Sequence, residues 1–163
     1  MITAFDPQMD PIYFIGEFTK VEVIDAAPPI IVGNPNLDPS KPYWIEVEWT
    51  LKGFFVPPWL SALDNPSGSK RWVVEAYATP MGPGQEKKIA EINIPVGPPY
   101  NQPKTYSATL TVLAGELQEH TPGGPSGIYK LTISAFLDTP LGLPGYAISG
   151  YATGTVIRAE NPV

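Results

Sequence analysis

The chain has 163 residues, 43% of them hydrophobic and 11% aromatic, which is enough apolar material for one domain with a sizeable core. Its 10 basic and 16 acidic residues give a net charge of −6, which argues against nucleic acid as a main partner, because phosphate binding needs clustered basic side chains. The absence of cysteine excludes disulfides, thiolate metal sites and a cysteine nucleophile. The 21 prolines and 15 glycines fall mostly between apolar runs, a pattern typical of short strands joined by turns.

Residues 1–16 form an apolar arm that is interrupted by proline and aspartate. Its large apolar residues are Phe5, Met9, Ile12, Tyr13, Phe14 and Ile15. The prolines argue against a helix, and side chains this apolar are expected to be buried against another surface. Two interpretations remain open, since the arm is either an edge strand of its own domain or an added strand in a neighbouring subunit. We therefore divide the chain into an arm over residues 1–16 and a single domain over residues 17–163.

Seven segments after the arm predict β-strands, because apolar and polar side chains alternate along most of them with a period of two. They span residues 18–25, 43–52, 71–79, 87–95, 105–113, 127–138 and 146–158. Only residues 57–63 suit a helical turn, because their two leading prolines fit the first turn of a helix. Seven short strands without a long helix predict an all-β, antiparallel sandwich.

Gly127 and Tyr129 stand in G-x-Y spacing at the start of the clearest strand. This spacing resembles the tyrosine corner that opens strand F of immunoglobulin-like sandwiches. Where that family carries an Asp and a Cys, this chain has Pro125 and Leu131, so the resemblance implies the fold without its disulfide. The Tyr129 hydroxyl is then expected to reach a backbone group within residues 117–126.

The same resemblance implies positions for two more core residues. Val47 takes the place of the family's other cysteine, opposite Leu131, so that aliphatic packing replaces the bridge. Trp72 takes the place of the buried tryptophan of strand C. The resemblance therefore implies a disulfide-free, immunoglobulin-like sandwich of about seven strands, and it concerns architecture alone.

Few residues are candidates for catalysis or metal binding. His120 is the only histidine, it lies in a loop rich in proline and glycine, and no Gly-x-Ser-x-Gly elbow accompanies it. Calcium needs only oxygen ligands, which residues 6–10 and Asp64 offer without matching a known loop. Glu46 and Glu48 point the same way from one strand, whereas glycosidase carboxylates flank a bond from different sides. We therefore expect no enzymatic activity, no cofactor and no metal.

Three connections between the predicted strands are rich in apolar side chains: residues 53–70, 96–104 and 139–145. In the constant-type immunoglobulin strand order they emerge at one end of the sandwich. Their side chains either plug the core or, together with the arm, form a contact surface. The candidate contact residues are Phe5, Ile12, Tyr13, Phe14, Phe54, Phe55, Trp59, Tyr100, Leu141 and Leu143.

The expected function is protein–protein contact without catalysis, as a subunit of a homomeric assembly. The alternative is a carbohydrate-binding sandwich in which Trp44, Trp59 or Tyr77 stacks on sugar rings. Coplanar aromatics exposed along one sheet face favour sugar, whereas an exposed patch continuous with the arm favours assembly. The sequence shows no signal-peptide pattern and no apolar run of membrane-spanning length, so we expect no membrane span, and it indicates no compartment.

Overall fold

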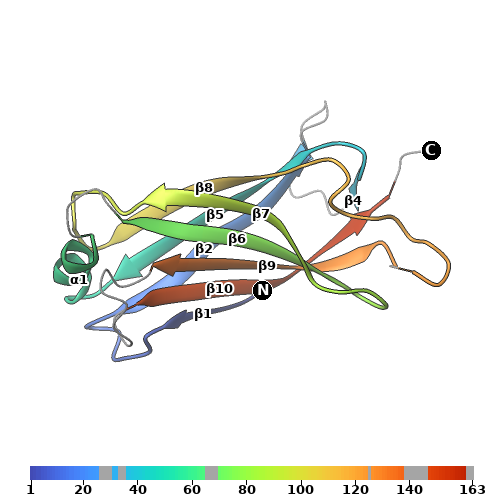
Figure 1. Cartoon of the computed structure of the whole chain (residues 1–163). Helices are drawn as coiled ribbons and strands as arrows, with labels where there is room; N and C mark the ends of the chain where they lie inside the picture. The colour runs from blue at the N-terminus through green and yellow to red at the C-terminus, as the bar shows by residue number, and fades with distance from the viewer. Residues whose placement is uncertain (26–30, 33–35, 65–69, 125, 138–146, 161–163) are drawn as a thin grey trace.

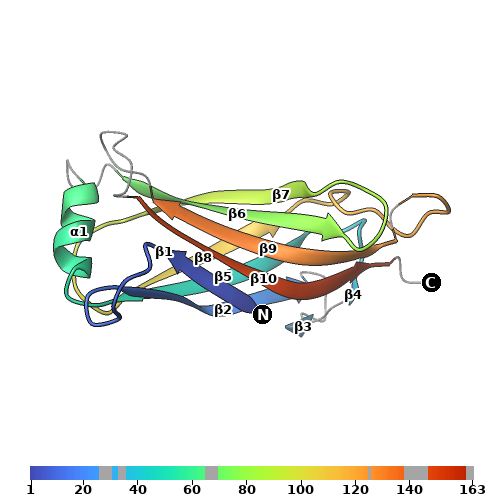
Figure 2. The same cartoon turned by 90° about the horizontal axis from the view of Figure 1, so that it is seen from below.

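Two β-sheets packed face to face make up the structure, with one short helix at one end (Figures 1 and 2). The structure is a computed structural model, and it describes residues 1–25, 31–32, 36–64, 70–124, 126–137 and 147–160. The helix, α1 (Val56–Leu63), begins with prolines in its first turn, where their missing N–H groups break no helical hydrogen bond.

Within the described residues the larger sheet has six strands and the smaller one four. The larger sheet runs in the order β1 (Ile2–Asp6), β10 (Ile148–Ala159), β9 (Ile128–Leu137), β6 (Arg71–Pro80) and β7 (Lys87–Pro95), with β4 (Asn36–Leu37) also paired to β10. The smaller sheet runs in the order β3 (Ile31–Val32), β2 (Ile15–Asp25), β5 (Tyr43–Lys52) and β8 (Lys104–Val112). All pairings are antiparallel except that of β4 with β10. The predicted all-β sandwich is confirmed, and each of the seven predicted strands is present. The predicted bounds are those of β5 and β7, and the other five strands have shifted ends.

The core lies between the inward faces of β5 and β9. Their buried side chains follow the predicted alternation: Tyr43, Ile45, Val47, Trp49 and Leu51 on β5, and Tyr129, Leu131, Ile133, Ala135 and Leu137 on β9. Trp72 of β6 is buried as expected, and its ring lies 5.5 Å from that of Trp49 at an interplanar angle of 73°. Aromatic pairs favour such edge-to-face geometry. The two sheets are therefore joined at the centre by an aromatic contact.

The Tyr129 hydroxyl ties the β8–β9 loop to the start of β9. It donates to the carbonyl oxygen of Gln118 at 2.9 Å and accepts from the N–H of the same residue at 3.0 Å. Gly127 has φ +79°, and a Cβ there would press on the backbone of His120, so this position favours glycine. The hydrogen bond predicted from the G-x-Y spacing is confirmed.

The arm is built into its own sandwich. β1 pairs with β10, and Phe5 enters the core, where its ring lies 5.1 Å from that of Phe18. Gly16 and Gly150 make room for Phe5, since a Cβ on either one would overlap its ring. Phe14 is also buried. Residues 2–6 of the arm are therefore an edge strand of their own domain, which is one of the two interpretations that the sequence left open.

We predict that Leu131→Ala lowers the free energy of unfolding by about 2–5 kcal/mol, because it leaves a cavity at a fully buried position between the sheets. Urea denaturation measures the change. Leu113→Ala is the matched control, because Leu113 is exposed and its truncation should change stability by no more than about 0.5 kcal/mol. A loss below about 1 kcal/mol for Leu131→Ala would contradict the inward placement of this residue.

We predict that Tyr129→Phe lowers the free energy of unfolding by about 1–3 kcal/mol, because it keeps the ring but leaves two Gln118 backbone groups without their partner. Tyr151→Phe removes an exposed hydroxyl and serves as the control. Equal denaturation midpoints for the two variants would show that the corner contributes no stability.

Candidate interaction surface

Exposed apolar side chains gather at the α1 end of the sandwich, where Figure 1 places the helix beside the loop between β1 and β2. Ile12, Tyr13, Phe54 and Phe55 are between 44% and 64% exposed. The N–H of Phe54 donates to the carbonyl oxygen of Ile12 at 3.0 Å, and that of Phe55 to Tyr13 at 2.9 Å. The rings of Tyr13 and Phe55 stack with centroids 4.9 Å apart. These four contiguous residues are called the end patch below.

The backbone under the end patch is fixed by a close approach at Gly53. This glycine has φ +120°, and a Cβ there would collide with the backbone of Tyr13 and Phe14. Its N–H donates to the side-chain oxygen of Gln102 at 3.0 Å. On the arm side, the N–H groups of Tyr13 and Phe14 both donate to the carbonyl oxygen of Asp10, at 2.9 and 3.2 Å. The patch is thus presented on hydrogen-bonded backbone.

A buried layer supports the end patch from below. The ring of buried Phe14 lies 5.4 Å from that of Trp59, which is itself half-buried on α1. The helix turns its other large apolar residues into the core: Val56, Leu60 and Leu63. Apolar side chains at this end therefore divide into a layer that closes the core and a layer that remains exposed.

Asp64, directly after α1, connects two of the loops at this end. One carboxylate oxygen accepts the backbone N–H of Lys70 at 2.9 Å, and the other accepts the Tyr100 hydroxyl at 2.7 Å. Because Asp64 is almost fully buried, these bonds offset the loss of its hydration. The carboxylate that the sequence offered as a possible calcium ligand holds the loops together.

The predicted contact residues have different locations. Phe5 and Phe14 are buried in this chain's own core and do not reach the surface, because β1 pairs with β10 and α1 covers Phe14. Trp59 and Tyr100 are half-buried against the core. Outside the described residues lie Leu141 and Leu143. The remaining four predicted contact residues are those of the end patch.

Sequence reasoning left Met9 and Ile15 out of the contact set, although both side chains are exposed. The signal for Ile15 was present in the sequence. Ile15 is the first residue of β2, in which Phe18 is buried, and residues an odd number of positions apart in a strand point to opposite faces, so Ile15 points outward. Met9 lies in the loop between β1 and β2, where no periodicity indicates exposure.

The three aromatic residues considered for sugar stacking lie on three different surfaces. Trp44 is on the outer face of the smaller sheet, Trp59 is on α1, and Tyr77 is on the outer face of the larger sheet. The Tyr77 hydroxyl donates to Glu75 at 2.6 Å, a hydrogen bond that raises the pKa of Tyr77. These three side chains do not form one stacking platform.

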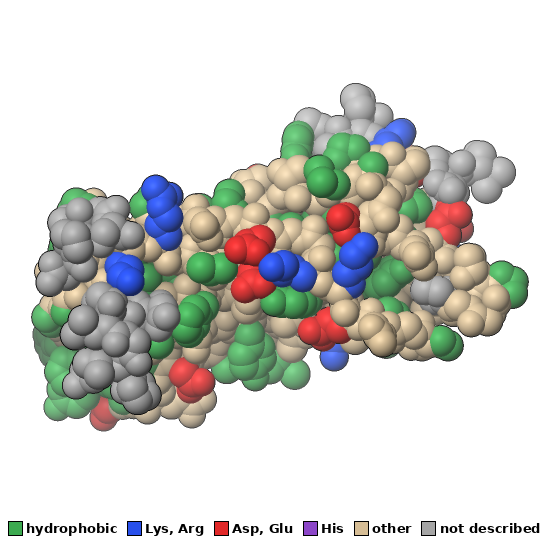
Figure 3. Space-filling model, in the orientation of Figure 1, with side chains coloured by type: hydrophobic (Ala, Val, Ile, Leu, Met, Phe, Trp, Pro, Cys, Tyr) green, Lys and Arg blue, Asp and Glu red, His purple; other side chains and the backbone are tan. Residues whose placement is uncertain are grey.

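The outer face of the larger sheet is charged in its middle. Figure 3 shows acidic and basic side chains next to each other there. Lys88 lies 3.6 Å from the Glu75 carboxylate and 2.8 Å from that of Glu91. Phe136 and Tyr151 are exposed on neighbouring strands of the same face. The exposed apolar side chains of this face therefore share it with ion pairs between β6 and β7, whereas the end patch carries no charged side chain.

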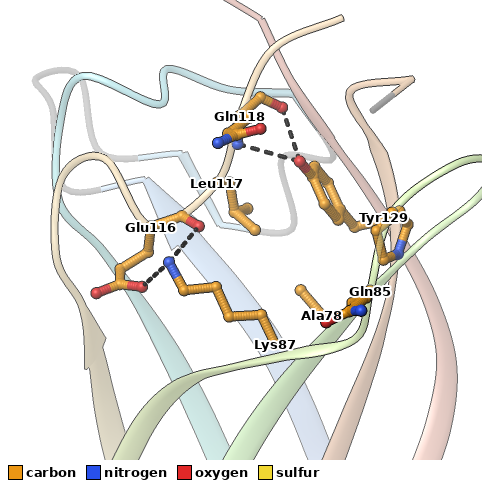
Figure 4. A pocket seen from close by; sticks show the side chains of 9 residues that line it. Ala78, Gln85, Lys87, Glu116, Leu117, Gln118 and Tyr129 are labelled. Atoms are coloured by element: carbon orange, nitrogen blue, oxygen red, sulfur yellow. Dashed lines mark hydrogen bonds and ion pairs between the residues drawn. The ribbon is translucent and has the colours of Figure 1, made fainter. Parts of the chain in front are cut away.

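A pocket of about 230 Å³ lies at the opposite end, between the β6–β7 hairpin and the β8–β9 loop (Figure 4). The Lys87 ammonium lies 2.7 Å from the Glu116 carboxylate, so the two charges in the pocket neutralise each other. His120 is exposed and is not among the residues that line the pocket. The described part of the chain contains no group of three or more acidic or histidine side chains placed to hold a metal ion.

Comparison with known proteins found no family model and no curated protein that matches this chain. Within the described ranges, no helix has the length and apolar character needed to cross a membrane. The geometry of the end patch is therefore the feature of this chain that indicates a function.

We predict that Gly53→Ala lowers the free energy of unfolding by more than the 1–3 kcal/mol or so expected for a strained backbone alone, because its methyl group must also displace the backbone of Tyr13. Gly97→Ala is the control, since Gly97 also has positive φ but nothing lies within 4 Å of its Cβ position. Urea denaturation gives both values. Equal losses would contradict a tight contact between Gly53 and the arm.

Proposed function

We propose that the protein is a non-enzymatic interaction module that self-associates through the end patch. The observation that supports this most is a contiguous set of four large apolar side chains, exposed on fixed backbone. Exposed apolar patches of this kind mark contact sites, and aromatic residues contribute most of the binding energy at such sites. The stacked rings of Tyr13 and Phe55 are the proposed anchors.

In this proposal the module is immunoglobulin-like. Such sandwiches place strands A, B and E in one sheet and C, F and G in the other. Six of the seven predicted strands follow this division, with β2, β5 and β8 in the smaller sheet and β6, β9 and β10 in the larger. The fourth, β7, pairs with β6, whereas the constant-type order expected from the sequence would place it beside β8. The hydrogen bond of the Tyr129 hydroxyl also supports the likeness.

The proposed partner is a second copy of the chain. Two copies that both carry a net charge of −6 repel each other, but the end patch itself contains no charged residue. The charged side chains near it form hydrogen bonds and ion pairs within the same chain. A carboxylate oxygen of Asp10 accepts the N–H of Ile12 at 3.0 Å, and Lys52 lies 3.1 Å from the Glu17 carboxylate. A two-fold contact between two copies places the same patch on both sides. Added salt should therefore strengthen the association, because it screens the overall repulsion.

Exposure favours assembly over sugar binding. The end patch is continuous with the arm, which is the arrangement expected of a contact surface. The aromatic residues considered for sugar stacking lie on separate surfaces, and none is more than about a third exposed.

We predict that Ile12→Ser combined with Phe54→Ser weakens self-association by at least about tenfold. Both side chains are more than half exposed, and burial of each in a contact contributes on the order of 1 kcal/mol or more. Sedimentation velocity across a dilution series measures the mass. Met81→Ser with Val156→Ser is the matched control, because these residues are similarly exposed away from the patch. An intact protein that is monomeric at every concentration, or equal masses for the two double variants, would overturn the proposal.

A further inference from the structure

We propose that β8 is a second docking surface, which pairs antiparallel with β8 of another copy and joins two smaller sheets into one continuous sheet. This contact goes beyond the end patch and does not depend on it. Among the described residues, β8 pairs with β5 on one side and with no strand on the other. An edge strand of this kind presents a row of unpaired backbone N–H and C=O groups to any added strand.

The other described edges are shorter or protected. β3 has two residues and β1 has five. The part of β2 that β3 leaves unpaired, residues 15–23, carries three charged side chains and a register shift. β7 begins with Lys87 and Lys88, ends at Pro95 and contains a register shift, all of which oppose strand addition. β8 has nine residues in unbroken register with β5, and carries neither charge nor proline between Thr105 and Val112. It is the one long described edge that lacks these safeguards.

The sandwich is also incompletely closed beside β8. Ile92 and Ile94 of β7 face inward, opposite the fully buried Val74 and Trp72. Both isoleucines nevertheless remain half-buried, on the side where β7 approaches β8. A second copy placed along β8 adds apolar cover to this side, which an isolated chain lacks.

The side chains of β8 are complementary to themselves. A slip of one residue would set inward side chains against outward ones, so the register that overlaps the whole strand has its two-fold axis at Ala108. Ser107 of one copy then faces Thr109 of the other, and Thr105 faces Thr111. These are hydroxyl pairs on the exposed face, which favour cross-strand pairing, and no like charges face each other.

The acidic side chains on the neighbouring strand do not oppose this pairing. Glu46 of β5 is held by Lys20, whose ammonium lies 2.6 Å from its carboxylate. In the paired sheet, Glu46 of one copy lies across from Glu48 of the other, three strand spacings away, about 14 Å. That distance exceeds the screening length of about 8 Å at physiological ionic strength.

The test variant is Ser107→Lys with Thr109→Lys. Within one copy each new ammonium group lies opposite a carboxylate, because Ser107 pairs with Glu48 and Thr109 with Glu46. The two substitutions should therefore not destabilise the fold of a single copy. Between two copies, however, the new ammonium groups face each other. The matched control is Ser134→Lys with Ser149→Lys, which adds the same charge to the outer face of the larger sheet.

All variants are built on the Ile12→Ser, Phe54→Ser background, so that the end patch does not contribute to the measured mass. Sedimentation velocity should show at least tenfold weaker pairing for the β8 variant and unchanged pairing for the control. A background protein that is monomeric at all accessible concentrations, or equal pairing in variant and control, would overturn the β8 contact. Neither result bears on the end patch, which is tested by restoring Ile12 and Phe54.

Amide hydrogen exchange gives a second readout that does not depend on the substitutions. In the background protein, alternate amides of β8 should exchange more slowly as concentration rises, because their N–H groups donate to the second copy. Amides of the central strand β9 are the internal control and should not change. Exchange of β8 amides that is independent of concentration would contradict the pairing.

Discussion

The edge-to-face contact between Trp49 and Trp72 is the interaction on which the rest of the sandwich depends, because one ring comes from each sheet. Tyr106 of β8 packs on both rings, with centroids 5.5 and 5.4 Å away. On the other side, Phe18 lies 6.3 Å from Trp49, and Phe5 lies 5.1 Å from Phe18. The aromatic row thus runs from the β8 edge to the N-terminal strand, and the proposed β8 contact surface is anchored to it through Tyr106.

Alternation predicted much of the fold, because β5 and β9 each bury one face and expose the other. It did not locate Phe5, whose burial depends on the space left by Gly16 and Gly150, residues remote from each other in the sequence. The end patch was predicted in part. Its exposed residues were in the candidate set, but which aromatic side chains of the arm face outward depends on the approach of Gly53, a tertiary contact that no local pattern contains.

The two proposed contacts together define a type of assembly. Each is a two-fold contact in which a surface meets its own copy, and a single contact of this kind stops at a dimer. A chain that carries two such surfaces in different places can continue through both, so that copies join end to end and edge to edge in alternation. In this proposal the module is a building unit whose extent of assembly is set by whichever contact is weaker.

The four tryptophans also allow folding and surface contacts of this protein to be followed by spectroscopy. Two rings held 5.5 Å apart at 73° are close enough for their electronic transitions to couple, which produces near-ultraviolet circular dichroism only while the sheets are in register. The other two tryptophans, Trp44 and Trp59, are partly accessible to water, and the ring of Trp59 touches the layer beneath the end patch. Dichroism from the buried pair thus follows folding, while quenching of the accessible pair by solutes follows what covers the surface.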